Sequence, residues 1–341
     1  FVIVGQATNE QSGTRVAALG DINGDGWSDL LIGAPGANNG TGRSYVVFGK
    51  TNTFAVNLNL VASGSGGFVI TGQEAGDQSG SDVAALGDVN GDGLSDFLVG
   101  APAANGGAGR SYVVFGKANT SAVNLNLVAS GSGGFVINGN SDDASGSRVT
   151  ALGDFNGDGL ADFLIGTGNN DSGFVVFGKT DTRALALNSL GKQDGFAIRS
   201  AVTGDLSSLS ITAGGDINGD GYADVLIGAR AANAGAGQSY VIFGGARFIT
   251  SALVQARGAV TGTAADEALV GSSDADTLTG GGGVDRFFGG AGDDVFVLTA
   301  SDIANLSTTT VSNGVLATVD GGSGLDTIRL TGGANLNLST I

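Results

Sequence analysis

The stretch Asp21-Ile22-Asn23-Gly24-Asp25-Gly26-Trp27-Ser28-Asp29 decides how this chain folds, because its pattern occurs four times. The other copies span residues 88–96, 154–162 and 216–224, and every copy reads D-x-N-x-D-G-x-x-D. A glycine at position 6 permits a tight turn, and the oxygen side chains at positions 1, 3, 5 and 9 then converge on one point. Position 7 needs no polar side chain, because its backbone carbonyl can face that point.

Clustered hard oxygen donors of this kind are typical of a Ca²⁺ site. Three aspartates within nine residues repel one another unless a cation lies among them, and four loops without a metal would repeat that cost. The alternative for any single loop is an Asp- and Asn-rich turn that binds no metal. The predicted calcium ligands are Asp21, Asn23, Asp25, Trp27, Asp29; Asp88, Asn90, Asp92, Leu94, Asp96; Asp154, Asn156, Asp158, Leu160, Asp162; and Asp216, Asn218, Asp220, Tyr222, Asp224.

A helical EF-hand is the competing interpretation of these loops. It requires a bidentate glutamate at position 12. This chain has Ile32, Val99, Ile165 and Ile227 at that position. The flanking segments 16–19 and 30–33 are short and apolar, as expected of strands. The loops are therefore predicted to connect β-strands.

Composition excludes several classes of function. The net charge of −17 argues against nucleic acid or an anionic membrane as a partner. The chain has no Cys and no His, which excludes disulfides, Ser-His-Asp and Cys-His catalysis and histidine-based zinc sites. No apolar run reaches the about 18–20 residues that span a bilayer, so no membrane insertion is expected. The chain is predicted not to be an enzyme.

The repeat that contains the loops has the size of one supersecondary unit. The loops begin at residues 21, 88, 154 and 216, and each unit contains four short apolar runs. In the second unit these runs are 83–86, 97–100, 111–115 and 135–137, bounded by Gly, Asn or Asp. Four short antiparallel strands per repeat form the blade of a β-propeller. The fold class is therefore all-β.

These units resemble the FG-GAP repeats of integrin α-subunit propellers and their bacterial relatives. Phe-Gly pairs begin at residues 48, 115, 177 and 243, and Gly-Ala-Pro begins at residues 33 and 100. The third and fourth units depart from Gly-Ala-Pro, with Gly166-Thr167-Gly168 and Gly228-Ala229-Arg230. The resemblance covers residues 1–250 and implies calcium loops on one face of a seven-bladed ring, with partners on the opposite face.

Four blades are fewer than that ring contains, and the segment Phe1–Val4 has the pattern of an outermost blade strand. We expect either that about three further blades belong to a longer protein, which we favour, or that Phe1–Val4 completes the fourth blade of a small ring. The linker 50–67 is copied almost verbatim at 117–134. The alternation of Val56, Leu58 and Leu60 predicts that part of it forms an added edge strand.

A nine-residue period begins at Gly262 and predicts a second domain at residues 251–341. Successive nonapeptides begin with glycine, have an acidic residue at position 6 and an apolar residue at position 8, and a separate copy spans 321–328. They resemble RTX nonapeptides, which form a short parallel β-roll with Ca²⁺ between turns. The first copy departs from the motif with Glu267, and residues 297–320 interrupt the series. The alternative is a Gly-rich turn array without metal. The predicted roll ligands are Asp276, Asp285, Asp294 and Asp326.

Both segments point to calcium as the cofactor, and the resemblances imply a bacterial protein that is secreted by a type I system and is extracellular or on the cell surface. We expect a calcium-stabilised recognition or adhesion module of a larger protein. Its partner, a protein or glycan, would contact the face opposite the calcium loops, at turns 35–43, 102–110 and 229–238 and connections 73–82 and 140–148. The alternatives are a non-catalytic accessory region of a secreted hydrolase, or a passive spacer.

Overall fold

The structure is a computed structural model of the 341-residue chain, which forms two compact units. The first unit contains residues 1–190, 208–227 and 241–245, and the second contains residues 191–207, 228–240 and 246–341. The predicted domain boundary at residue 250 stays a prediction. The structure describes residues 1–168, 172–191, 193–200, 210–229, 236–245, 252–255, 259–262, 267–271, 274–281, 285–289, 292–300, 302, 318–321 and 324–331.

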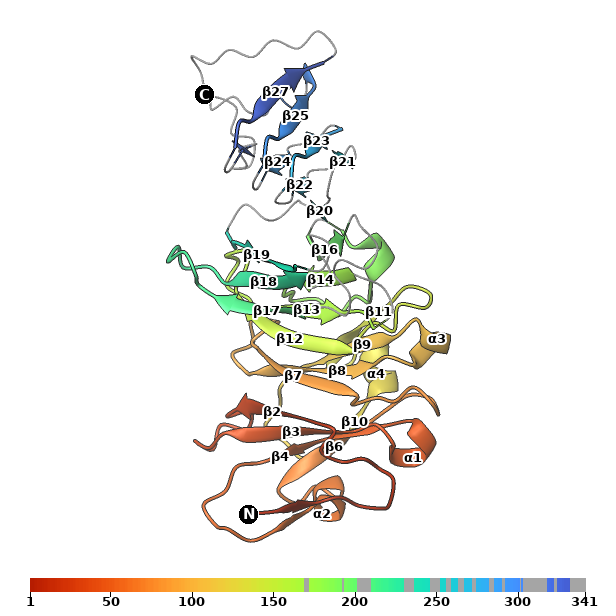
Figure 1. The fold of residues 1–341 in the computed structure, drawn as a ribbon. Coiled ribbons are helices and arrows are strands. Elements are labelled where there is room, and N and C mark those ends of the chain that lie inside the picture. The colour runs from red at the N-terminus through yellow and green to blue at the C-terminus, as the bar shows by residue number, and fades with distance from the viewer. Residues whose placement is uncertain are drawn as a thin grey trace. The chain divides into compact units, whose positions relative to one another are not determined.

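The first repeat forms an antiparallel blade of four strands, as predicted (Figure 1). The strands are β2 (Arg15–Gly20), β3 (Asp29–Ala34), β4 (Arg43–Val47) and β6 (Gly67–Thr71). They lie in chain order, with Val16 opposite Ile32, Ile32 opposite Tyr45, and Tyr45 opposite Val69. The calcium loop connects β2 to β3, so the EF-hand interpretation is excluded by the flanking strands.

The later repeats follow the same plan. The second blade consists of β7 (Asp82–Gly87), β8 (Asp96–Ala101), β9 (Arg110–Val114) and β11 (Gly134–Asn138). In the third repeat the antiparallel strands β12 (Arg148–Gly153), β13 (Asp162–Gly166) and β14 (Ser172–Val176) are described. The fourth repeat contributes the sheet β17 (Ser210–Gly215), β18 (Asp224–Ala229) and β19 (Gln238–Ile242).

The linker between blades is only partly a strand. Val56–Asn57 forms the two-residue strand β5, and its copy β10 (Val123–Asn124) pairs in parallel with β6. The predicted alternation fails at Leu58, where helix α2 (Leu58–Ala62) begins, because the Asn57 side chain accepts a hydrogen bond from the Asn59 N–H and caps the helix. Copy α4 (Leu125–Ala129) repeats this arrangement. Strand β15 (Leu185–Ala186) and the 3₁₀ helix Leu187–Ser189 occupy the corresponding place in the third repeat, where β15 pairs in parallel with β11.

The N-terminal strand has the position that its sequence predicts. β1 (Ile3–Val4) pairs in parallel with β5, as β6 pairs with β10 and β11 with β15, so it occupies the place of an outermost blade strand. The number of blades in a complete ring stays a prediction.

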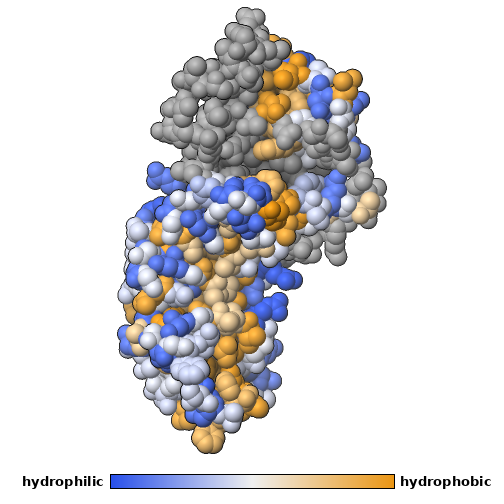
Figure 2. All heavy atoms as spheres, turned by 90° about the vertical axis from the view of Figure 1, so that its left-hand side faces the viewer, coloured by the Kyte–Doolittle hydropathy of each residue, from blue (hydrophilic) through white to orange (hydrophobic). Residues whose placement is uncertain are grey.

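Large aromatic side chains fill the space between the first two blades. Phe68, Phe97 and Tyr112 are fully buried in one cluster that contains residues of both repeats. The Lys117 Nζ lies 3.9 Å from the centre of the Phe68 ring, and Lys179 lies 4.3 Å from the Phe135 ring, so each lysine covers the outer strand of the preceding blade. The surface in Figure 2 shows hydrophobic residues among the hydrophilic ones on the face it presents.

The second unit contains a roll of parallel strands, as the nine-residue period predicts. One row contains β20 (Ala252–Gln255), β22 (Glu267–Val270), β24 (Arg286–Phe288) and β26 (Thr318–Asp320). The other contains β21 (Ala259–Thr261), β23 (Thr277–Thr279), β25 (Val295–Leu298) and β27 (Thr327–Leu330). Strand β16 (Gly195–Ser200) pairs with β20. Position 8 of the four successive nonapeptides fills the interior, with Leu269, Leu278, Phe287 and Phe296 at most 1% exposed, whereas Ile328 in the separate copy is 43% exposed.

Candidate metal sites

Each of the four loops wraps its backbone around the carboxylate at position 1. In the first loop, Asp21 Oδ1 accepts a hydrogen bond from Gly24 N–H at 2.7 Å, and Asp21 Oδ2 accepts one from Gly26 N–H at 2.7 Å. Both glycines adopt positive φ angles, 77° and 89°, which other residues rarely adopt. The same pair of bonds recurs on Asp88, Asp154 and Asp216. The curled loop that the glycines predict is therefore present in all four copies.

The side chains at positions 3 and 5 face the same centre. Asn23 Oδ1 and Asp21 Oδ1 both accept the N–H of Asp25, at 2.9 and 3.0 Å, so these two oxygens lie close together. The Asn23 amide donates to Asp25 Oδ2 at 3.0 Å, and Asp25 Oδ1 accepts from Trp27 N–H at 2.9 Å. The bonds of the position-3 and position-5 side chains recur in the other three loops. The bond from the position-5 N–H to the position-1 carboxylate recurs in the second and fourth loops.

The aspartate at position 9 has a role that the sequence did not indicate. It is fully buried in all four loops, as Asp29, Asp96, Asp162 and Asp224. In the first loop, Oδ2 of Asp29 accepts the N–H of Ile22 at 3.0 Å, and Oδ1 accepts the N–H of Gly49 at 2.7 Å. Equivalent bonds connect the other three aspartates to the loop and to the Phe-Gly turn. This carboxylate therefore joins the calcium loop to the Phe-Gly turn that follows the third strand.

The glycine of the Phe-Gly pair is required by this contact. A Cβ atom on Gly116 would lie 2.9 Å from the Leu94 Cβ, and one on Gly49 would lie 2.8 Å from the Ser28 carbonyl oxygen. Only glycine allows the turn to come close enough to donate to the buried carboxylate. In the sequence, this contact corresponds to a spacing between the position-9 aspartate and the glycine of the Phe-Gly pair. The glycine follows Asp29, Asp96 and Asp224 by 20 residues and Asp162 by 16.

Burial and neighbouring charge both disfavour the ionised form of position 9. Loss of water around the buried carboxyl raises the pKa of Asp96 to about 6 and the pKa of Asp162 to about 7, although backbone N–H donors oppose the shift. The negative charges of Asp92 and Asp88 raise the Asp96 pKa further, and Asp158 acts in the same way on Asp162. Negative charge is thus concentrated in each loop, as a cation site requires.

Two of the four residues at position 7, Leu160 and Tyr222, pack against the preceding loop. Leu160 lies against Gly91 of the preceding loop, and Tyr222 lies against Gly157. Backbone bonds join the same loops, since Ala161 N–H donates to the Asp88 carbonyl at 2.9 Å. Trp27 in the first loop is 51% exposed. These side chains have a packing role, which is compatible with the predicted use of their carbonyls.

The carboxylates of the second unit form a ladder along one edge of the roll. Asp276 N–H donates to Asp294 Oδ1 at 2.8 Å, and Asp294 N–H donates to Asp326 Oδ1 at 3.1 Å. Asp276, Asp285 and Asp294 are at most 2% exposed, whereas Asp326 is half-buried. The structure therefore brings Asp276, Asp294 and Asp326 together and places Asp285 elsewhere. The side chain of Glu267 lies outside the described residues.

The donor sets fit a hard divalent cation. All side-chain donors are carboxylate or amide oxygens. Burial, with a smaller contribution from acidic neighbours, raises the pKa of Asp29, Asp96 and Asp162. Among the residues that the structure describes, no three acidic side chains already form a metal cage. The ligands assigned from the sequence stay a prediction.

We expect Asp96→Ala, measured in a chelator, to lower the free energy of unfolding by about 2 kcal/mol or more, because it leaves the buried N–H groups of Val89 and Gly116 without an acceptor. The control, Asp92→Ala, removes bonds to exposed groups and should cost no more than about 0.5 kcal/mol. Urea denaturation measures both. Equal losses would contradict the role assigned to position 9.

The raised pKa of Asp162 predicts a pH dependence in the metal-free protein. The folded state holds the proton up to about pH 7, whereas the unfolded carboxyl releases it near 3.8, so this stabilisation is complete below pH 3.8 and is lost as pH rises through 7. Asp162→Asn cannot ionise. In EDTA, the unfolding free energy of the wild type relative to this variant should fall by more than about 1 kcal/mol between pH 4 and 7.5. A constant difference would show that burial does not perturb Asp162.

The FG-GAP repeat family matches residues 12–47, 79–114, 145–181 and 209–242, which contain the four loops. The RTX calcium-binding nonapeptide repeat, a model of four copies, matches residues 261–296. Both matches confirm the resemblances stated from the sequence. Within the described residues, no helix is both long enough and apolar enough to cross a membrane.

Curated relatives include integrin α chains. The chain is 29% identical to integrin alpha-PS2 of Drosophila melanogaster over 224 residues, which is 62% of this chain and 14% of that protein. It is 29% identical to integrin alpha-4 of Xenopus laevis over 209 residues, covering 59% of this chain and 18% of that protein. It is 36% identical to the phosphatidylinositol-glycan-specific phospholipase D of Rattus norvegicus over 111 residues, covering 30% and 13%.

The chain therefore spans less than a fifth of the length of these relatives. Its antiparallel blades and parallel roll agree with the two families, and both kinds of repeat point to an extracellular or secreted protein. The chain contains four FG-GAP repeats and an RTX calcium-binding nonapeptide repeat, and it is similar to integrin α chains.

Proposed function

We propose that this chain is a calcium-stabilised recognition or adhesion module of a larger secreted or cell-surface bacterial protein. The observation that carries the proposal is the fourfold loop with a fully buried aspartate at position 9. In the first three loops, burial and, to a smaller extent, the acidic residues nearby raise the pKa of this aspartate. A cation in each loop would offset that charge. The matched RTX repeat supports calcium as this cation.

Several residues of each loop would coordinate Ca²⁺ together. The side chains at positions 1, 3 and 5 and the carbonyl at position 7 would supply oxygens from the loop. Position 9 would supply an oxygen of a carboxylate that already accepts two backbone N–H groups, one on each oxygen. Bound calcium supplies positive charge that favours the ionised carboxylates. Sites of the extracellular class have dissociation constants of about 10⁻⁴–10⁻³ M. Such sites would fill outside the cell, as a type I secretion route requires.

The proposed recognition face lies at the opposite ends of the strands, because α1 (Ala37–Gly40) and α3 (Ala104–Gly107) connect β3 to β4 and β8 to β9. Figure 1 shows both turns on the same side of the first unit. Asn38, Asn39 and Asn105 are exposed there and adopt positive φ angles. Exposed amides in fixed turns suit hydrogen bonding to a glycan or to a protein backbone.

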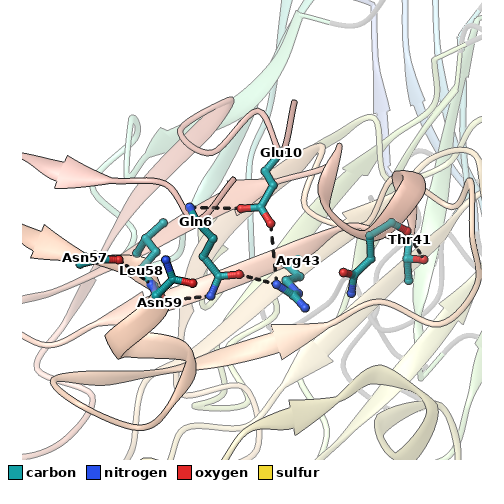
Figure 3. A network of polar contacts seen from close by, with 8 residues as sticks. Gln6, Glu10, Thr41, Arg43, Asn57, Leu58 and Asn59 are labelled. Atoms are coloured by element: carbon teal, nitrogen blue, oxygen red, sulfur yellow. Dashed lines mark hydrogen bonds and ion pairs between the residues drawn. The ribbon is translucent and has the colours of Figure 1, made fainter. Parts of the chain in front are cut away.

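The arginines of this face stabilise it. Arg43 donates to Gln6, whose own amide donates to the Leu58 carbonyl at 3.1 Å, and Arg43 lies 3.8 Å from Glu10 (Figure 3). In the second blade, Arg110 donates to Gln73 and to Asn105. Each arginine thus connects a turn to the segment that enters the blade. The exposed asparagines are the better candidates for ligand contact.

The second candidate function is a non-catalytic accessory region of a secreted hydrolase. It is favoured by the match to a phosphatidylinositol-glycan-specific phospholipase D, which is an enzyme by name. We propose that the chain itself is not catalytic, since it lacks the histidine and cysteine of the common acid–base and nucleophilic sites. A passive spacer remains the third candidate.

Calcium should raise the melting temperature of the chain. At a calcium concentration of about 100 times the dissociation constant, each filled site contributes about 2.7 kcal/mol. Differential scanning calorimetry in 10 mM CaCl₂ and in EDTA measures the effect, with 10 mM MgCl₂ as the control for ionic strength and charge. Identical melting in calcium and EDTA would refute the proposed cofactor.

Recognition is tested by screening the immobilised chain against glycans and extracellular proteins, with and without a chelator. A calcium-dependent ligand should bind the combined variant Asn38→Gly, Asn39→Gly at least about tenfold more weakly, because glycine keeps the positive φ angles and removes the exposed amides. The control is Ser28→Ala on the exposed surface of the first calcium loop. The absence of any ligand would favour the spacer, and equal binding by the variant would move the site away from these turns.

A further inference from the structure

The turns of the roll lie along two edges, and the series of nonapeptide turns is interrupted along only one of them among the described residues. Along one edge, turns 271–276, 289–294 and 321–326 connect a strand of the first row to a strand of the second. Along the other edge, turn 280–285 connects β23 to β24, and the turn that would follow it after β25 is replaced by the interrupting segment 299–317. The nonapeptide series therefore stops on that edge at Asp285.

On the complete edge, two oxygens approach each opening glycine. A Cβ atom added to Gly271 would lie 2.8 Å from Oδ2 of Asp276, which belongs to the same turn. The same Cβ would clash with the Gly289 carbonyl oxygen of the next turn. A Cβ atom added to Gly289 would clash with Asp294 Oδ2 and would lie 2.6 Å from the Gly321 carbonyl oxygen. The pattern is one carboxylate oxygen of the turn itself and one carbonyl oxygen of the turn that follows.

On the interrupted edge, the second oxygen comes from a side chain. A Cβ atom added to Gly280 would clash with Oδ2 of Asp285 in the same turn and would lie 3.0 Å from Asp302 Oδ1. Asp302 belongs to the interrupting segment and to no nonapeptide. Its carboxylate oxygen therefore stands where the complete edge has the carbonyl of the next turn.

Asp302 is held in this position. It is 1% exposed, and its Oδ2 accepts bonds from the N–H and the hydroxyl of Thr299, at 2.7 and 2.8 Å. Its Oδ1 is buried and has no hydrogen-bond partner among the residues that the structure describes. Asp285 is also 1% exposed. Two buried carboxylates directed at the same point repel each other unless a cation or a shared proton lies between them.

We propose that Asp302 is a calcium ligand that closes the interrupted edge of the roll together with Asp285. The inference rests on the proposed calcium binding of the roll and adds a ligand from outside the repeat motif. An ionised carboxylate there would offset the loss of the carbonyl that the next nonapeptide would supply. The interrupting segment would then be anchored by the metal at the point where it leaves the roll.

The test is the number of calcium ions bound by the full chain, measured by equilibrium dialysis, for the wild type, Asp302→Asn and the control Asp293→Asn. Asp293 is exposed, and its Oδ1 accepts from Leu325 N–H, which an amide oxygen can also do. Asp302→Asn should bind one ion fewer than the wild type, and the control should bind the same number. An unchanged number in Asp302→Asn would overturn the inference and favour a shared proton.

A second variant tests the inference independently, in case Asp302→Asn does not fold. Thr299→Val removes the hydroxyl that orients Asp302 and leaves both carboxylates, so one site should weaken by about tenfold while the number of ions stays the same. Unchanged affinity at every site would overturn the inference. A wild-type chain that binds no calcium would refute the proposed function, whereas a wild type that binds calcium and an Asp302→Asn variant that binds as many ions would refute this inference alone.

Discussion

A buried carboxylate that accepts two backbone N–H groups from distant segments holds each described blade together. In the second blade, the Asp96 carboxylate accepts hydrogen bonds from the Val89 N–H of its own loop and from the Gly116 N–H of the turn after the third strand. The arrangement is stable only if the carboxyl group is kept neutral or its charge is compensated, because the site excludes water and lies beside two other aspartates. The proposed calcium ion meets that requirement while it binds the exposed part of the same loop.

The loops also contact one another within the first unit. Ala223 N–H donates to the Asp154 carbonyl at 3.0 Å, and Gly245 N–H donates to the Phe155 carbonyl at 2.7 Å. The third repeat therefore binds to the second loop, and the fourth repeat binds to the third loop. A cation that orders one of these loops also orders the backbone groups that the next repeat uses. A chain exported unfolded would gain its blade contacts and its metal ligands together, since neither is present in the unfolded state.

The roll of the second unit uses acidic residues in a related way. Carboxylates are buried along its edges, where each turn follows another, and the apolar position-8 side chains fill the interior. Where the repeat is interrupted, Asp302 supplies an oxygen that the missing turn would have provided. Both units thus place negative charge at turns, and the apolar strands between those turns need only pack.

The sequence by itself determined the four loops, the strands on either side of them and the parallel roll, because these depend on local spacing: glycine at position 6, alternating apolar runs and a nine-residue period. Only the tertiary structure decided what long-range contacts do. The position-9 aspartates bond to glycines 16 or 20 residues away, and Arg43 and Arg110 donate to Gln6 and Gln73, 37 residues away. Helix α2 begins at Leu58 because Asn57 caps it, a local contact that outweighs the predicted alternation. Asp302 belongs to no repeat, so no local pattern encodes its place beside Gly280 and Asp285.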